Sequence, residues 1–183
     1  MPRLFVGLDV PEHVEKALMR LEYGLEDMNW VDPKNFHLTL RFIGEVAEDQ
    51  MDRVRFVLDQ IDFVPFSMHI NGMGCFKKRG GKCTGLWASV DPGEELLALA
   101  EKVNTPFEGP LNVKKFFKAF TPHITLARPK NKKVKDVQSF LDHNRIFQIR
   151  DIPVTEFYLY ESHGAEDENS DYEILDTYTA SSQ

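Results

Sequence analysis

The chain has 183 residues, is 42% hydrophobic and carries a formal net charge of −7 at pH 7. This length is sufficient to bury a substantial core, and we expect residues 1–183 to form a single domain of two packed lobes. The negative net charge argues against a protein that coats nucleic acid indiscriminately. The apolar stretch near the N-terminus is too short for a signal sequence or a membrane span, so we expect a cytoplasmic protein without membrane association.

The first part of the chain alternates predicted strands and helices. The strands show period-two alternation, and the helices carry their apolar residues on one stripe. The first helix follows Pro11, a residue favoured at helix starts, and the second strand ends at Gly44. In order, the predicted elements are a strand, a helix, a strand, a helix and a strand over residues 3–10, 11–25, 36–44, 47–61 and 63–72.

The second part continues this pattern with longer connections. Residues 74–85, GCFKKRGGKCTG, are predicted as a basic, glycine-rich connection, and residues 104–120 as a long loop without clean periodicity. Residues 164–171 are predicted as an acidic hairpin loop. The remaining predicted elements are strands over 86–90, 123–128, 146–149, 153–162 and 172–180, and helices over 91–103 and 134–144.

Positive charge is concentrated in the middle of the chain. Residues 77–135 contain 13 lysines and arginines against 5 aspartates and glutamates, a local net charge of +8, which leaves −15 for the rest. A basic central segment in an acidic chain favours a protein that binds a polyanion at one localised site.

The two cysteines, Cys75 and Cys83, are predicted to be free thiols, because a single cysteine pair in a cytoplasmic protein is more often reduced than bridged. Together with His69 they do not reproduce a usual zinc-ligand spacing, and a fourth ligand is missing. We therefore predict no metal site and no cofactor.

One short pattern occurs twice. FHLTLRF begins at Phe36 and PHITLAR begins at Pro122, so that His37 and His123 lie 86 positions apart and each is followed two positions later by threonine. We call this pattern the HxT motif. After each copy the sequence predicts a turn, a helix and a strand, which opens with VPFSM at residues 64–68 or IPVTE at residues 152–156. Such internal similarity indicates two halves related by an approximate two-fold axis, with both HxT strands at the centre.

The spacing of the HxT motif places its polar side chains together. In a strand, residues i and i+2 point to the same face, so each histidine shares a face with its threonine at about 6.6 Å Cα spacing. The alternate positions are apolar and anchor the strand in the core, which holds the polar pair rigidly. These anchoring residues are Leu38 and Leu40 in the first copy and Ile124 and Leu126 in the second.

Two facing imidazoles are well suited to phosphoryl transfer. The pKa of histidine, near 6.5, allows one ring to take a proton from attacking water while the other donates a proton to the departing oxygen. The hydroxyls of Thr39 and Thr125 can hold the non-bridging phosphate oxygens. No metal is required by this scheme, which favours a strained ester such as a ribose cyclic phosphate.

An arginine follows each motif, and strand parity distinguishes the two. In an unbroken strand Arg41 would share the face of His37 and Thr39 and could bind phosphate. Arg128 has the opposite parity to His123, so it would reach the same face only if its strand bulges or ends early. The alternative for both residues is a structural salt bridge.

HLTLRF and HITLAR resemble the paired motifs of the two-histidine phosphoesterase superfamily. More narrowly, RLFVGLDV, FHLTLRFIGEV, FTPHITLAR and LYES resemble the RNA 2′,3′-cyclic phosphodiesterases, also called 2′-5′ RNA ligases, over almost the whole chain from Arg3 to Tyr178. The resemblance implies a bilobal α+β fold with two antiparallel β-sheets, helices on the outer faces and an active-site cleft between the lobes.

The resemblance also implies an activity and roles for the motif residues. The expected reaction is hydrolysis of an RNA 2′,3′-cyclic phosphate end, such as that of a tRNA fragment, to a 2′-phosphate, with reversible 2′-5′ ligation as a related activity. His37 would donate a proton to the leaving 3′-oxygen and His123 would accept the proton of water, with Thr39 and Thr125 beside them. We expect a monomer that acts on RNA.

Two alternatives to this function stay open at the level of sequence. The same histidines could act on small nucleotides, such as a cyclic phosphate of ADP-ribose. A cleft of this kind could also bind RNA ends without catalysis, although binding alone does not need groups that titrate near neutral pH.

Overall fold

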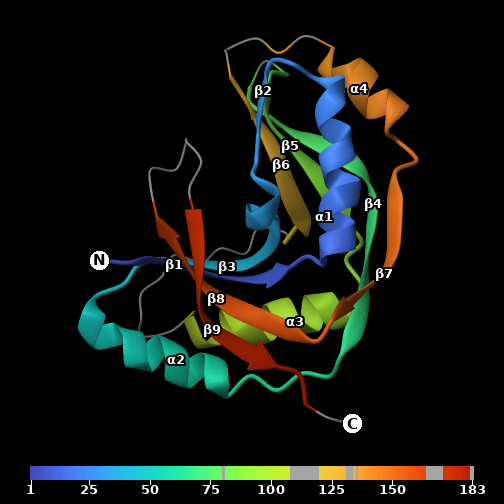
Figure 1. Ribbon diagram of the computed structural model, residues 1–183. Helices are drawn as coiled ribbons and strands as arrows, with labels where there is room; N and C mark the ends of the chain where they lie inside the picture. The colour runs from blue at the N-terminus through green and yellow to red at the C-terminus, as the bar shows by residue number, and fades with distance from the viewer. Residues whose placement is uncertain (80, 108–119, 131–133, 135, 164–170, 182–183) are drawn as a thin grey trace.

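The structure is a computed structural model that describes residues 1–79, 81–107, 120–130, 134, 136–163 and 171–181. Its dominant feature within these residues is one antiparallel sheet of nine strands, ordered β7-β4-β5-β6-β3-β1-β8-β9, with β2 paired to β6 (Figure 1). The strands are β1 (Arg3–Asp9), β2 (Met28–Trp30), β3 (His37–Glu45), β4 (Phe66–Lys77), β5 (Cys83–Val90), β6 (His123–Pro129), β7 (Gln148–Val154), β8 (Glu156–His163) and β9 (Asp171–Thr179).

The two HxT strands meet in the middle of this sheet. The predicted α+β class with antiparallel strands is confirmed, but the two predicted sheets are joined into one where Leu38 of β3 pairs with Ile124 of β6. This junction is short because β2 occupies the same edge of β6 from Ala127 to Pro129. Each half of the sheet therefore has its own set of strands, and the HxT motifs lie at the border between them.

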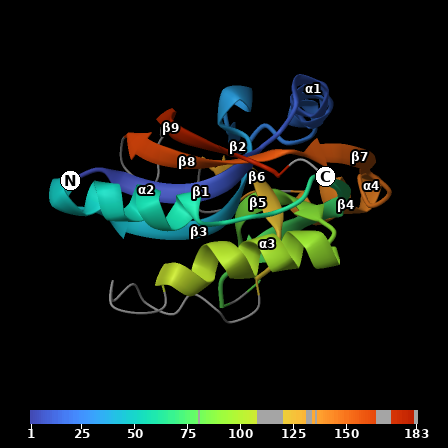
Figure 2. The same cartoon turned by 90° about the horizontal axis from the view of Figure 1, so that it is seen from below.

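The helices gather in two places. They are α1 (Glu12–Met19), α2 (Met51–Asp59), α3 (Glu94–Asn104) and α4 (Val137–His143). In both views α1 and α4 lie together near β4 and β7, while α2 and α3 lie toward β1 and β3, with α3 below the strands in Figure 2. Acidic residues open α3 at Glu94 and Glu95 and Lys102 lies in its last turn, which complements the helix dipole.

The core is one continuous cluster of buried apolar side chains from both halves of the sheet and from the helices. It includes fully buried residues of β1, β3 and β6 together with Val14 and Leu18 of α1 and Val103 of α3. The apolar positions of both HxT motifs belong to this cluster, so the core fixes the strands that carry the histidines. No helix in the described part of the chain is long and apolar enough to cross a membrane.

The hairpin of β4 and β5 is longer than the sequence predicts. Most of the glycine-rich stretch 74–85 is strand rather than connection, because two glycines serve packing across the hairpin. A Cβ at Gly74 would overlap the ring of Trp87, and Gly85 pairs with Phe76. Cys75 and Cys83 lie on these strands as free thiols.

Some predicted segments differ or lie outside the described residues. The three-residue strand β2 is absent from the prediction, and β7 extends through Pro153, which is tolerated because β7 is an edge strand. Residues 105–107 of the predicted loop form a 3₁₀ turn, whereas 108–119 lie outside the described residues. The same holds for residues 164–170 of the acidic loop.

Candidate active site

The four predicted HxT residues lie around the junction of the sheet halves. Leu38 and Ile124 pair across the junction and are fully buried, so the residues on either side of them point to the opposite face. The antiparallel direction sets each histidine beside the threonine of the other strand. The partly exposed residues brought together in this way are His37, Thr39, His123 and Thr125.

Both imidazoles are oriented by the same backbone contact. Nδ1 of His37 lies 2.8 Å from the carbonyl oxygen of Asn35, and Nδ1 of His123 lies 2.7 Å from that of Thr121. A carbonyl oxygen only accepts, so Nδ1 carries the hydrogen in both rings and Nε2 is left for acid–base chemistry. Nε2 of His37 lies 3.1 Å from the hydroxyl of Thr39, which can donate to it.

The environment of His37 disfavours its charged form. Burial lowers the pKa of His37 to about 4, the hydrogen bond to Asn35 opposes this shift, and the charge of His123 lowers the pKa further. The rings of Phe5 and Tyr172 lie with centroids 4.7 and 5.0 Å from the imidazole and supply this apolar surface. The imidazole of His37 is therefore neutral at pH 7, and the two histidines interact electrostatically.

His123 has flat rings beside it as well. Its imidazole lies edge-on to Phe76, with centroids 5.0 Å apart, and 6.0 Å from the ring of Trp87. Phe76 is 41% exposed, so part of its ring remains accessible beside the imidazole. Ser89 pairs with His123 across β5 and β6 and adds a hydroxyl to the same face.

A β-bulge follows the first HxT motif. Gly7 of β1 pairs with Thr39, but the preceding residue Val6 pairs with Arg41, so Leu40 is an extra residue on β3. Such a bulge shifts the alternation of side chains by one position. Arg41 consequently points to the opposite face from Thr39, whereas an unbroken strand would have placed both on one face.

The structure places Arg41 in the interior, in contact with α3. Its side chain is 1% exposed, and Nη1 donates a hydrogen bond of 3.0 Å to Oδ1 of Asn104. The amide of Asn104 in turn donates to the carbonyl oxygens of Leu40, at 3.1 Å, and Ala100, at 2.6 Å. Asn104 therefore binds both the bulge and the arginine that the bulge turns inward, and Arg41 supports the motif from behind rather than facing the histidines.

A second bulge occurs at the equivalent position of the other motif. Thr125 and Ala127 pair with successive residues of β5, so Leu126 is the extra residue on β6. Ala127 is fully buried, and the exposed Arg128 therefore returns to the face of His123. Burial raises the pKa of Tyr172, and the charge of Arg128 acts in the opposite direction, which places Arg128 within electrostatic reach of the ring beside His37.

Comparisons with known proteins identify the family of this chain. Residues 8–87 match the model of a family described as LigT like phosphoesterase. A protein of Archaeoglobus fulgidus named RNA 2′,3′-cyclic phosphodiesterase is 32% identical over 133 residues, which cover 71% of this chain and 74% of that protein. The chain belongs to the LigT-like phosphoesterase family. A protein of Aquifex aeolicus with the same name is 31% identical to this LigT-like chain over 173 residues, covering 87% and 88% of the two chains.

The fold of this LigT-like phosphoesterase is also found in solved structures. A crystal structure of a Thermus thermophilus protein is similar with a TM-score of 0.76 and 27% sequence identity, and the similarity covers 97% of both chains. The likeness therefore extends across both halves of the sheet, whereas the family model ends before the second HxT motif.

Sequence reasoning missed two residues that support the LigT-like site. Gly7 lets β1 approach the first motif, because a Cβ there would lie 2.9 Å from the carbonyl oxygen of Leu38 and 3.6 Å from the ring of His37. The sequence signal for Gly7 is a glycine within a strand pattern, which often marks a site where another backbone segment or a ligand comes close to the strand. Asn104 had no such signal, since the sequence predicts it as the first residue of the long loop 104–120, whereas the structure includes it in α3.

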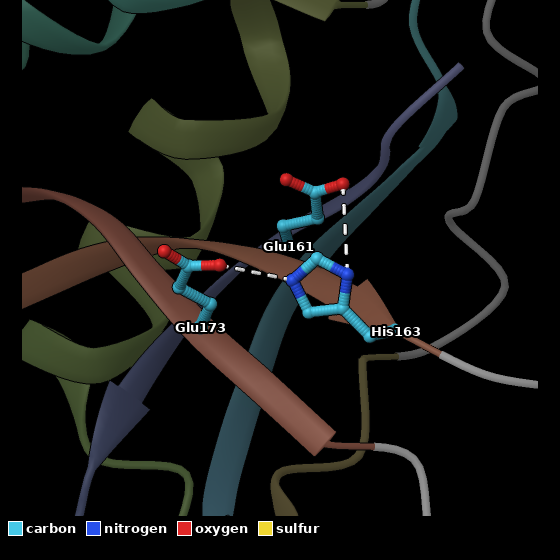
Figure 3. Close-up of side chains that lie close together, drawn as sticks. All are labelled: Glu161, His163 and Glu173. Carbon is cyan, nitrogen blue, oxygen red and sulfur yellow. Dashed lines mark hydrogen bonds and ion pairs between the residues drawn. The ribbon is translucent and has the colours of Figure 1, made fainter.

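A group of possible metal ligands lies near the C-terminal end of β8 and the N-terminal end of β9 (Figure 3). Glu161 and His163 are two residues apart on β8, and Glu173 pairs with Glu161 across the strands. Their ligand atoms lie within 4.8 Å of one another. His163 already contacts both carboxylates, with Nε2 3.0 Å from Glu173 and Nδ1 3.9 Å from Glu161, and we assign no ion to this exposed cluster of the LigT-like phosphoesterase.

Proposed function

We propose that this protein hydrolyses RNA 2′,3′-cyclic phosphate ends to 2′-phosphates by acid–base catalysis with its two motif histidines. One observation carries the proposal: His37 and His123 lie on one face of the sheet beside the Leu38–Ile124 pair, and each has Nδ1–H bound to a backbone carbonyl so that Nε2 is available. RNA as substrate is supported by the names of the relatives from Archaeoglobus fulgidus and Aquifex aeolicus.

The reaction is an in-line displacement at phosphorus. A water oxygen forms a bond to the phosphorus atom while Nε2 of His123 takes a proton from that water. The bond from phosphorus to the 3′-oxygen breaks, and Nε2 of His37 gives its proton to that oxygen. The products are a free 3′-hydroxyl and a 2′-phosphate, and the next cycle requires only that the two rings exchange protons with solvent. An RNA 5′-hydroxyl that attacks the phosphorus in place of water, with the same bond to the 3′-oxygen breaking, would give 2′-5′ ligation, and the reverse of that step would regenerate the cyclic phosphate.

Three further side chains have roles in this scheme. The hydroxyls of Thr39 and Thr125 donate hydrogen bonds to the non-bridging oxygens and hold the phosphorus between the rings. Arg128, which shares the face of His123, supplies the positive charge for the phosphate. These groups together provide an acid, a base and an anion site from protein side chains alone, so the proposed reaction needs no metal ion.

The low pKa of His37 fits a proton donor that becomes protonated only when the substrate binds. An anionic phosphate beside the ring stabilises the imidazolium and raises the pKa of His37 above the value of about 4 that it has in the protein alone. A donor with a low intrinsic pKa then releases its proton readily to the departing alkoxide.

The test is turnover of an RNA oligonucleotide that ends in a 2′,3′-cyclic phosphate. His37→Ala and His123→Ala should each reduce kcat by roughly 10² to 10⁴-fold, the exposed His13→Ala should not, and EDTA should have no effect. Chromatography against authentic standards should identify a 2′-phosphate as the product. Unchanged activity in either motif variant would contradict the proposal, and tight binding of the oligonucleotide without product would indicate a binding module instead.

A further inference from the structure

A polar pocket of about 470 Å³ is lined by residues of β4 and β7 and by Asp91, which follows β5. Its walls carry hydrogen-bonding side chains that the proposed mechanism does not use. They include His69, Asn71, Asp91, Gln148 and Arg150.

The pocket opens on the sheet face that carries His123. Ile70 of β4 and Val90 of β5 pair with each other and are buried, so the residues beside them, Asn71 and Asp91, point to the opposite face. That is also the face of Ser89 and of its partner His123. Only β5 separates β4 from β6, so the pocket begins about 10 Å from the histidine, which is two strand spacings.

The backbone connects the pocket to the histidine strand. The amide of Val90 donates to the carbonyl oxygen of Pro122, at 3.1 Å, immediately before His123. The next amide, that of Asp91, donates to the carbonyl oxygen of His69, at 2.9 Å. The wall of the pocket and the catalytic strand are thus held in a fixed relation.

The lining is pre-arranged by its own hydrogen bonds. Gln148 donates to Oδ1 of Asn71, at 3.0 Å, and accepts from Nη2 of Arg150, at 3.3 Å. Nδ1 of His69 accepts from the backbone of Asp151, at 3.0 Å, so its Nε2 carries the hydrogen. Asp151 has a φ of 56°, a left-handed conformation that is uncommon outside glycine and that this hydrogen bond helps to hold.

The charges of the pocket select the kind of group that it can bind. Two carboxylates, Asp91 and Asp151, face one guanidinium, that of Arg150, which disfavours a phosphate. Asparagine and glutamine amides pair with adenine edges, and aspartate accepts from exocyclic amino groups. A neutral group rich in donors and acceptors, such as a base with its ribose, therefore matches the lining.

We propose that this pocket binds the nucleoside immediately 5′ to the nucleotide that carries the cyclic phosphate. This inference rests on the proposed function, and it makes the preferred substrate an RNA end of at least two nucleotides rather than a mononucleotide. The phosphate that links the two nucleosides would cross β5 near Ser89, outside the acidic pocket.

The test compares a nucleoside 2′,3′-cyclic phosphate with a dinucleotide that ends in the same cyclic nucleotide. The wild-type protein should have the higher kcat/KM on the dinucleotide. Asn71→Ala and Gln148→Ala, both at exposed positions, should lower that value about fivefold to tenfold through KM and leave turnover of the mononucleotide unchanged. Gln138→Ala, on α4 and away from the pocket, is the matched control.

An equal effect of the variants on both substrates, or no effect on either, would overturn the inference. If the wild-type protein converts neither substrate, the proposed function has failed, and binding then tests the pocket separately. A dinucleotide ending in a 2′-phosphate should bind more tightly than the mononucleotide 2′-phosphate in calorimetry. That difference should disappear in Gln148→Ala but persist in Gln138→Ala, and its persistence in Gln148→Ala would refute the pocket as a nucleoside site.

Discussion

Acidification should destabilise this protein through His37, and the magnitude follows from its pKa. The pKa falls from 6.5 in the unfolded chain to about 4 in the folded protein. Between these values the unfolded chain binds a proton that the folded protein does not bind. The stability contributed by neutral His37 is thus complete above pH 6.5 and is lost as the pH falls toward 4. Linkage gives a loss of about 2 kcal/mol between pH 7 and pH 5, and about 3 kcal/mol at the acid limit.

The perturbation that isolates this effect is His37→Asn. The asparagine amide can replace Nδ1–H as the donor to the carbonyl oxygen of Asn35, but it does not titrate. Free energies of unfolding would be measured in urea at pH 7 and pH 5 for the wild type, the variant and the exposed control His13→Asn. We expect His37→Asn to lose about 2 kcal/mol less than the wild type between the two pH values. Equal losses in the wild type and His37→Asn would refute the assignment of a depressed pKa to His37.

Three further substitutions test the neighbouring residues. Arg128→Ala should raise KM for a cyclic-phosphate substrate by roughly 10 to 100-fold with a smaller change in kcat, because the proposed charge-assisted contact to phosphate would be lost. Asn104→Leu should destabilise the fold by about 3 kcal/mol, measured by urea unfolding, because it removes a hydrogen-bond partner of buried Arg41. Gly74→Ala should cost about 1 to 3 kcal/mol in the same assay, because the added Cβ would overlap the ring of Trp87.

Each of these substitutions has an informative comparison. Lys130→Ala removes an exposed positive charge two residues from Arg128 and should leave KM nearly unchanged if position, rather than charge alone, matters. Gly85→Ala, whose Cβ would meet Phe76 at 3.4 Å, should cost less than Gly74→Ala. A loss below about 1 kcal/mol in Asn104→Leu would mean that Arg41 does not depend on that amide.

The face on which the histidines lie could be predicted from the sequence, because the alternation of side chains along a strand can be read from that strand alone. His37 and Thr39 are two residues apart, and the apolar residue between them fixes which face is buried. The arginines could not be assigned in the same way. A β-bulge is a property of two paired strands. Nothing in HLTLR or HITLAR specifies that Leu40 has no paired residue on β1 or that Leu126 has none on β5. One extra residue in each strand reverses the parity of every position that follows.

The prediction of a connection over residues 74–85 was wrong for most of its length, for a related reason. A glycine within a cluster of lysines and cysteines is typical of a loop when only local sequence is considered. Gly74 is instead a strand residue whose missing side chain makes room for Trp87, on the partner strand β5. The close approach that it permits also sets the ring of Trp87 beside His123. The reason for this glycine therefore lies in a tertiary contact that local propensity does not contain.

The repeated motif produces an asymmetric site, which fits the proposed division of the two histidines into a proton donor and a proton acceptor. Two equivalent imidazoles would have equal tendencies to donate and to accept a proton. The bulges are equivalent, but the residues that follow them are not: Arg41 and Ala127 turn inward, whereas Phe42 and Arg128 turn outward. His37 is also packed against the rings of Phe5 and Tyr172, and its burial lowers its pKa, whereas His123 lies beside the partly exposed ring of Phe76. Under the proposed function, a bound anionic phosphate would pair with Arg128 and raise the pKa of His37, which would then take up a proton from solvent and act as the acid.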